Sequence, residues 1–294
     1  MSIWTTIATH ITTTTGKPFQ AASHQSISGG CINSAALVQD GERRFFVKLN
    51  RAAALEMFAA ESAGLEEIVE AGAIRAPHPL CHGTAGGQAY LVMEYIESGA
   101  PRAADAALLG EQLAALHHAQ AEHFGWKMDN TIGATPQDNT CDDDWCHFWG
   151  KRRLAPQLNL AARNGYRSRL QQRGEKLLVE LPRLLGEHQP APSLLHGDLW
   201  SGNYTFDAEG MPVIFDPAVY YGDREADMAM TELFGGFSPD FYRAYEATWP
   251  LPPGYDVRKH LYNLYHILNH ANLFGGGYVA QAENMLDRLL SEIG

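Results

Sequence analysis

The sequence predicts an α+β fold with two lobes, a small β-rich lobe followed by a larger helical lobe. In residues 1–97, short apolar segments alternate with glycine turns around one long helical pattern. From residue 98 to residue 294 the apolar spacing is mostly helical. A short stretch at residues 193–216 interrupts the helices and carries several acidic side chains. We therefore expect the functional site in a cleft between two lobes that meet near residue 97.

The apolar periodicity and the turn signals give the expected elements in order. In the first lobe they are a helix at 2–15, strands at 19–27, 34–39 and 45–48, a helix at 52–71, and strands at 79–81 and 88–95. In the second lobe they are helices at 104–120, 143–164, 168–186 and 224–234, and a helical remainder from 239 to 293 broken at 250–254 and 275–277. A long polar loop is expected at 124–140, and loops of this length are often functional.

Composition limits the classes of function. The 294 residues carry a formal net charge of −12, from 34 acidic and 22 basic residues, and such a surface repels nucleic acid and acidic membranes. No apolar run is long enough to span a membrane, and the N-terminus does not resemble a signal peptide. We expect a cytoplasmic protein without nucleic-acid or membrane partners. The four cysteines show no C-x-x-C pair, and His266 and His270 are interpreted as helix-face residues.

The stretch 193–216 predicts phosphoryl transfer. His196, Gly197 and Asp198 follow an apolar segment, Asn203 comes five residues after Asp198, and a second apolar segment ends in Asp216. One carboxylate facing an acceptor hydroxyl, with an amide oxygen and a second carboxylate on Mg²⁺, is typical of nucleotide-dependent phosphotransferases. The protein-kinase catalytic loop has the same Asp-to-Asn spacing, but an Arg where this chain has Gly. A hairpin with incidental acids is the alternative, and it does not explain the second acid.

Nucleotide-binding residues are expected in the first lobe. Lys48 ends an apolar strand, where protein kinases place the lysine that binds phosphates, and Glu61 on the following helix can orient it. The alternative is a surface lysine and a solvated acid. A glycine turn that could cover phosphates contains Gly29, Gly30, Cys31 and Ile32. An apolar strand running into a hinge against adenine would present Met93, Glu94, Tyr95 and Ile96. Asp227 is expected to bind the backbone of the catalytic loop.

Three stretches resemble the fructosamine/ketosamine kinase family: LLHGDLWSGN at 194–203, DPAVYYGDREADMAM at 216–230 and FGWKMDNTIGATPQDN at 124–139. The resemblance spans almost the whole chain. It implies a two-lobed protein-kinase-like fold and ATP-dependent phosphorylation of the 3-hydroxyl of a ketosamine, a sugar attached to an amine by glycation. The unstable product implies repair of glycated amines or proteins.

The resemblance also implies residue roles. Asp198 would be the catalytic base, Asn203 and Asp216 would bind Mg²⁺, and Lys48 with Glu61 would hold the phosphates of ATP. Candidate walls of the acceptor site are Trp200, Asp129, Trp145, Tyr220 and Tyr221, although the aromatic residues among them are equally suited to a core.

Two alternatives stay open. The first is a kinase of another small molecule, such as an aminoglycoside, choline or homoserine; residues 124–139 and 216–230 favour a ketosamine instead. The second is a pseudokinase that binds nucleotide as a sensor, and the competent residues at all catalytic positions argue against it.

Overall fold

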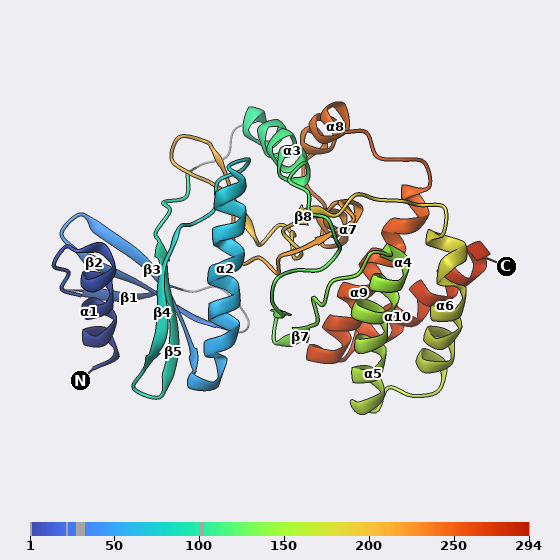
Figure 1. Ribbon diagram of the computed structural model, residues 1–294, viewed down its shortest axis with the longest axis horizontal. Coiled ribbons are helices and arrows are strands. Elements are labelled where there is room, and N and C mark those ends of the chain that lie inside the picture. Colours follow the sequence, from blue (N-terminus) through green and yellow to red (C-terminus); the bar gives the residue numbers. More distant parts are fainter. Residues whose placement is uncertain (1, 22, 28–32, 100–102, 294) are drawn as a thin grey trace.

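The computed structural model describes residues 2–21, 23–27, 33–99 and 103–293. Figure 1 shows a sheet-containing lobe that holds the N-terminus and a helical lobe that ends at the C-terminus, with the long helix α2 standing between them. The predicted α+β architecture with two lobes is confirmed. The predicted phosphate-covering turn at Gly29, Gly30, Cys31 and Ile32 lies outside the described residues. Among the described helices, none is long and apolar enough to cross a membrane.

The N-terminal lobe is a five-stranded antiparallel sheet with the strand order β1-β2-β3-β5-β4. Its strands are β1 Ser23–Ile27, β2 Ser34–Asp40, β3 Arg43–Arg51, β4 Pro79–Ala85 and β5 Gln88–Glu94. Helix α1 Ile3–Thr15 covers one face, and α2 Leu55–Ala71 covers the other. Successive side chains of β5 point to opposite faces of the sheet. Val92 therefore packs with Ile7 and Ile11 of α1, whereas Leu91 packs with Phe58 and its neighbours on α2.

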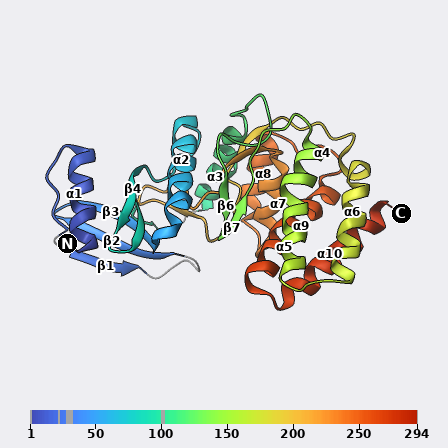
Figure 2. The same ribbon diagram turned by 60° about the horizontal axis from the view of Figure 1, so that its bottom comes forward.

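The C-terminal lobe is largely helical. Its helices are α3 Ala103–His117, α4 Trp145–Phe148, α5 Ala155–Arg163, α6 Arg169–Leu185, α7 Glu225–Leu233, α8 Pro239–Thr248, α9 Tyr255–Phe274 and α10 Gly277–Ile293. Helix α9 is mostly buried and packs against α5, α7 and α10. The view in Figure 2 shows α9 enclosed by these helices.

The helix expected at 143–164 is divided by a π-helical turn at Trp149–Leu154. Pro156 explains the division, because it has no N–H to donate to the carbonyl of Arg152. The Arg153 guanidinium donates to that carbonyl instead (3.2 Å), and also to the Asp138 carbonyl (2.7 Å). Arg153 lies in this π-helical turn, and its long side chain is fully buried.

Short two-stranded sheets position the functional residues. The expected loop at 124–140 contains a hairpin of β6 Asn130–Ile132 and β7 Thr135–Gln137. Strand β8 Ser193–Leu195 pairs with β11 Tyr220–Gly222, and β9 Tyr204–Phe206 pairs with β10 Pro212–Ile214. The segment between β8 and β9 holds Asp198 and Asn203, and the segment between β10 and β11 holds Asp216.

Candidate active site

The loop that carries Asp198 and Asn203 is held at its start by a buried carboxylate. Asp227 on α7 accepts the backbone N–H of His196 at 2.7 Å and that of Gly197 at 2.8 Å. Burial alone would raise the pKa of Asp227, but the hydrogen bond from His117 and the charges and N–H groups around it lower the pKa below its usual value. Asp227 is therefore ionised, and it fixes the loop by two charge-assisted hydrogen bonds. The sequence-based prediction for Asp227 is confirmed.

Gly197 is required by the close approach of two segments. Its φ is +82°, and a Cβ atom at this position would lie 2.1 Å from the carbonyl oxygen of Ala218. No other residue type fits there without moving the backbone. This contact explains why the segment lacks the arginine of protein kinases and why it can lie directly against the chain that follows Asp216.

His196 links the two acid-bearing segments. Its ring is fully buried, and burial lowers the pKa of the imidazole, so the ring is neutral. Nε2 donates to the carbonyl of Phe215 at 2.9 Å, and Nδ1 accepts the backbone N–H of Asp198 at 3.2 Å. The neutral imidazole thereby sets the backbone spacing between Asp198 and Asp216.

Asn203 orients Asp198. Its Nδ2 donates to the backbone carbonyl of Asp198 at 2.9 Å and lies 3.4 Å from the Oδ2 of that residue. This arrangement turns the Oδ1 of Asn203 to the other side, where it is suited to bind a hard cation. Burial within the cleft, followed by repulsion from Asp216 and Asp227, raises the pKa of Asp198 well above the usual range of an aspartate. A cation between these acids would relieve that repulsion.

Lys48 joins the two lobes at the same place. Its Nζ lies 2.5 Å from Oε1 of Glu61 on α2 and 2.6 Å from Oδ1 of Asp216. Burial alone would lower the pKa of Lys48, but the charges of Glu61 and Asp216 outweigh it and raise the pKa, so the side chain stays cationic. Asp216 has a φ of +59°, in the left-handed region that non-glycine residues rarely adopt. Such strain is found most often at functional sites.

Lys48, Asn203 and Asp216 line one cavity of about 1280 Å³ between the lobes. Of the predicted residues, those that line it are Lys48, Glu61, Met93, Glu94, Tyr95, Ile96, Asp198, Trp200, Asn203 and Asp216. The Glu94 carboxylate forms an ion pair with Arg75, at 2.7 Å. The cavity is large enough for a nucleotide beside a second small molecule.

The comparison with protein families agrees with this geometry. The family model described as fructosamine kinase matches residues 3–292. The chain belongs to the fructosamine kinase family. It is 51% identical over 288 residues to the "Probable ketoamine kinase" of Synechocystis sp., covering 98% of this chain and 97% of the relative. It is 44% identical over 280 residues to the chloroplastic protein-ribulosamine 3-kinase of Arabidopsis thaliana, covering 94% and 85%.

Solved structures show the same fold. The crystal structure of the "Putative fructosamine-3-kinase" of Haemophilus somnus has a TM-score of 0.90 and 27% identity, over 98% of this chain and 97% of that chain. An aminoglycoside phosphotransferase mutant in complex with ADP and hygromycin B has a TM-score of 0.66 at 17% identity, over 99% and 98% of the two chains, and shows the fold alone. The predicted kinase-like fold and family are therefore confirmed. This fructosamine kinase family member is an ATP-dependent phosphotransferase.

Four residues predicted as acceptor walls lie elsewhere. Trp145 is 4% exposed and donates from Nε1 to the Tyr262 hydroxyl at 3.0 Å. Tyr220 is 3% exposed, with the Arg153 guanidinium 4.1 Å from its ring centroid. The structure thus places both aromatic residues in the core, where their large apolar surfaces are buried.

The other two candidate walls have structural partners. Asp129 accepts the backbone N–H of Asn139 at 2.8 Å. Tyr221 donates its hydroxyl to Glu67 on α2 at 2.8 Å. Neither lines the cavity, and of the predicted acceptor residues only Trp200 does.

The sequence-based interpretation missed part of helix α9. His266, Asn269 and His270 line the cavity together with the β6–β7 hairpin. Burial lowers the pKa of His266 to about 3, so its ring is neutral, and its Nδ1 has no hydrogen-bond partner among the described residues. The available signal was the spacing of these three polar side chains, at positions i, i+3 and i+4, which places them on one side of the helix.

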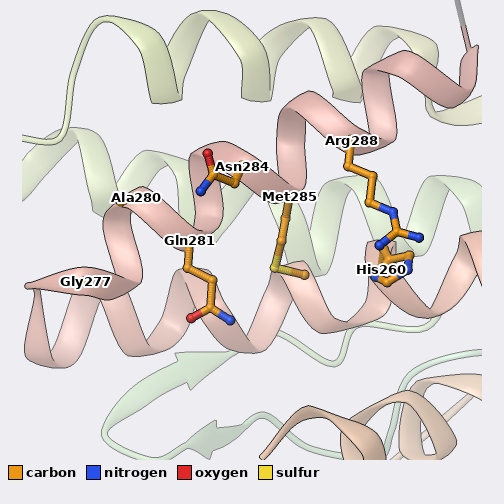
Figure 3. A pocket seen from close by; sticks show the side chains of 7 residues that line it. All are labelled: His260, Gly277, Ala280, Gln281, Asn284, Met285 and Arg288. Carbon is orange, nitrogen blue, oxygen red and sulfur yellow. The ribbon is translucent and has the colours of Figure 1, made fainter.

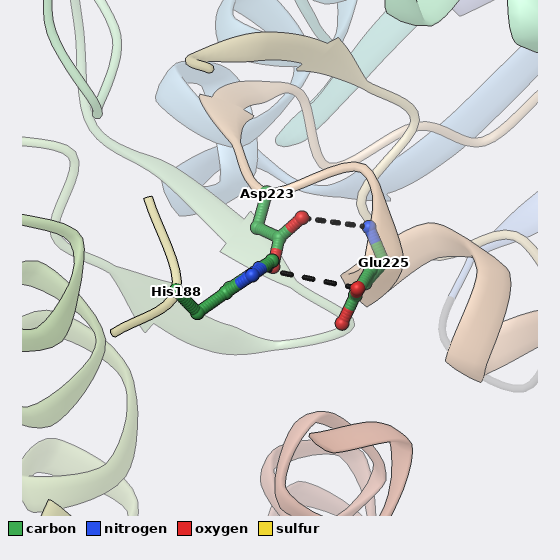
Figure 4. Close-up of side chains that lie close together, drawn as sticks. All are labelled: His188, Asp223 and Glu225. Atoms are coloured by element: carbon green, nitrogen blue, oxygen red, sulfur yellow. Dashed lines mark hydrogen bonds and ion pairs between the residues drawn. The ribbon is translucent and has the colours of Figure 1, made fainter. Parts of the chain in front are cut away.

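A second histidine–carboxylate cluster supports α7. As Figure 4 shows, His188 lies against Asp223, with Nε2 2.7 Å from Oδ2, and Glu225 is beside them. Arg258 binds both oxygens of Glu225, at 2.6 and 2.7 Å. Because Arg258 already pairs with Glu225, and Asp223 accepts the Glu225 N–H and the Tyr262 hydroxyl, the cluster is suited to anchoring the start of the helix that carries Asp227, rather than to binding a metal.

Another pocket, of about 460 Å³, lies on the C-terminal helices. Figure 3 shows its lining from α9 and α10, which includes His260, Asn284, Met285 and Arg288. It shares no lining residue with the interlobe cavity and contains no acid. The phosphotransferase chemistry therefore belongs to the interlobe cavity.

Proposed function

We propose that this chain transfers the γ-phosphoryl group of Mg-ATP to the 3-hydroxyl of a ketosamine. One observation carries the proposal: Asp198, Asn203, Asp216 and Lys48 face a single cavity in a chain of the fructosamine kinase family. The relatives named ketoamine kinase and protein-ribulosamine 3-kinase support the acceptor class. Small glycated amines and glycated proteins are both acceptors of this kind.

Asn203 and Asp216 are the proposed magnesium ligands. An amide oxygen and a carboxylate match the preference of Mg²⁺ for oxygen, with the remaining positions left to water and phosphates. When bound, the metal neutralises charge on the β- and γ-phosphates. Lys48, held by Glu61, adds a fixed positive charge beside the same phosphates.

Asp198 is the proposed base. Its position is fixed by Asn203 and His196, and its carboxylate is half-buried at the cavity wall. It accepts the proton of the acceptor hydroxyl as the new oxygen–phosphorus bond forms and the bond to the ADP oxygen breaks.

The remaining nucleotide contacts are proposed at the hinge and at the glycine turn. Met93, Glu94, Tyr95 and Ile96 line the cavity where β5 ends, and backbone groups there are suited to bind adenine. The turn residues Gly29, Gly30, Cys31 and Ile32 would cover the phosphates. Residues 1–97 would then form the nucleotide-binding lobe, and residues 98–294 the catalytic and acceptor-binding lobe.

The acceptor is proposed to lie beside Trp200, against α9. Trp200 is 38% exposed, and its ring meets that of Phe234 edge to face, with 6.2 Å between centroids. The neutral ring of His266 offers one donor and one acceptor, as sugar hydroxyls require. A cytoplasmic location and the absence of nucleic-acid and membrane partners stay predictions from the sequence.

The test is ATP consumption by the purified protein with four acceptors: ribuloselysine, fructoselysine, choline and kanamycin. Turnover with the two ketosamines alone is expected. Turnover with choline or kanamycin and not with a ketosamine would replace the proposed acceptor by another small molecule. ATP binding without turnover on any acceptor would favour a nucleotide sensor.

A further inference from the structure

The helix that carries Glu61 is tied to the C-terminal lobe by a second glutamate. Glu67, also on α2, accepts the Tyr221 hydroxyl at 2.8 Å on Oε1. Its Oε2 accepts Lys127 Nζ at 2.7 Å and Trp126 Nε1 at 3.3 Å. Figure 1 shows why this is possible, since α2 stands between the sheet and the helical lobe. One carboxylate thus gathers three donors from the opposite lobe.

The three donors form one surface next to the catalytic loop. Tyr221 lies on β11, which pairs with β8, the strand that leads into Asp198. The backbones of Gly125 and Tyr221 exchange two hydrogen bonds, at 2.8 and 2.9 Å, so Trp126 and Lys127 are fixed to the same strand. Glu67 therefore connects α2 to the backbone that positions the catalytic acids.

Helix α2 packs closely against the C-terminal lobe, and its contact through Glu67 is charged. A Cβ atom on Gly64 of α2 would lie 3.1 Å from Cγ2 of Val219, so the helix approaches the segment after Asp216 with little room to shift. Burial alone would raise the pKa of Glu67, but the hydrogen bonds from Lys127 and Tyr221 outweigh it and lower the pKa. Glu67 stays ionised, and hydrogen bonds to a charged group are stronger than neutral ones.

We propose that Glu67 is a positioning residue that holds α2 at the distance from the C-terminal lobe at which Glu61 presents Lys48 to the nucleotide. Lys48 contacts Glu61 on one lobe and Asp216 on the other, so its placement depends on the spacing between the lobes. Glu67 lies six residues after Glu61 on the same helix, about 9 Å along its axis. This inference rests on the proposed role of Lys48 in binding phosphates.

The first experiment compares steady-state kinetics of Glu67→Ala with those of Glu66→Ala, a control at the neighbouring, exposed position on α2. We expect kcat/KM for ATP to fall about tenfold in Glu67→Ala, as the loss of hydrogen bonds to a charged group implies, while KM for the ketosamine is unchanged. Tyr221→Phe and Lys127→Met, which each remove one donor, should give smaller losses of the same kind. Unchanged ATP kinetics in the folded Glu67→Ala, Tyr221→Phe and Lys127→Met enzymes would overturn the proposal.

A double-mutant cycle separates positioning from general destabilisation. If Glu67 acts through Glu61, then adding Glu67→Ala to Glu61→Ala should cause little further loss of kcat/KM for ATP. A full tenfold loss in both backgrounds would overturn the proposal. The proposed function has its own test in the single variant: full activity of Glu61→Ala would contradict the role of Lys48 and the positioning role together, whereas an impaired Glu61→Ala beside an unimpaired Glu67→Ala would overturn the positioning role alone.

Discussion

The carboxylate of Asp227 accepts the backbone N–H of Gly197 at 2.8 Å, which ties helix α7 to the turn that precedes Asp198. The same carboxylate accepts the N–H of His196, and the His196 ring reaches Phe215. Asp198, the proposed base, and Asp216 are therefore placed by buried hydrogen bonds to the backbone. Neither Asp227 nor His196 lines the interlobe cavity, so the geometry of the site depends on residues outside its lining.

Asp227→Asn should destabilise the protein at neutral pH by about 2–4 kcal/mol, because an amide cannot accept both N–H groups as a carboxylate does. The folded-state pKa of Asp227 is lowered. Its contribution is therefore complete above the unfolded-state pKa near 4 and is lost as the pH falls through the lower folded-state value. Denaturant unfolding of both proteins from pH 7 to pH 3 should show the difference shrinking with acid. A constant difference would contradict the ionised state of Asp227.

Gly197→Ala should abolish most activity and lower stability, because its Cβ would meet the carbonyl oxygen of Ala218. Gly87→Ala is a matched control. Gly87 has a φ of +80°, close to the +82° of Gly197, but no atom within 4 Å of the added Cβ. The control carries only the backbone cost of about 1 kcal/mol. Equal losses of melting temperature in the two variants would show that the contact with Ala218 is unimportant.

Asp216→Ala should weaken the metal-dependent part of ATP binding, because it removes a carboxylate oxygen from the proposed magnesium site. Calorimetric titration with ATP in the presence of Mg²⁺ and of EDTA measures that part directly. The ratio of the two affinities should approach one in the variant and be well above one in the wild type. An unchanged ratio would remove Asp216 from the metal site.

Asp198→Asn should fold, bind Mg-ATP and lose about 10²–10⁴ in kcat, the usual contribution of a general base. Asp256→Asn is a suitable control, because that side chain is 92% exposed on α9. Rates with a ketosamine, together with ATP affinity, separate a loss of chemistry from a loss of binding. Near-full turnover in Asp198→Asn would exclude Asp198 as the base.

Much of the fold follows from local sequence signals. The Asp40-Gly41 turn, the alternation along β5 and the helical spacing of α2 each act within a few residues, so the sheet and its long helix could be predicted. The division of the helix at 143–164 could not, because the π-helical turn goes with the burial of Arg153, whose guanidinium donates to the carbonyl of Arg152. That contact exists only once the core around it has formed.

Of the candidate site, too, only a part could be predicted from the sequence. Asp198, Asn203 and Asp216 lie within 19 residues of one another on short hairpins, and their spacing carries the prediction. Trp145 and Tyr220 were wrong as acceptor walls, because a sequence does not show which side of an aromatic residue meets the core. His266 was missed because α9 is mostly buried, and the sequence does not show that one side of this helix lines the cavity.

The most direct test of the central claim is the position of the phosphate in the product. Ribuloselysine, ATP, Mg²⁺ and the purified protein should give a product whose ³¹P–¹H coupling places the phosphate on the oxygen of carbon 3, and Asp198→Asn should form it at least 10²-fold more slowly. A phosphate on another hydroxyl, or none on the ketosamine while another alcohol is phosphorylated, would contradict the account.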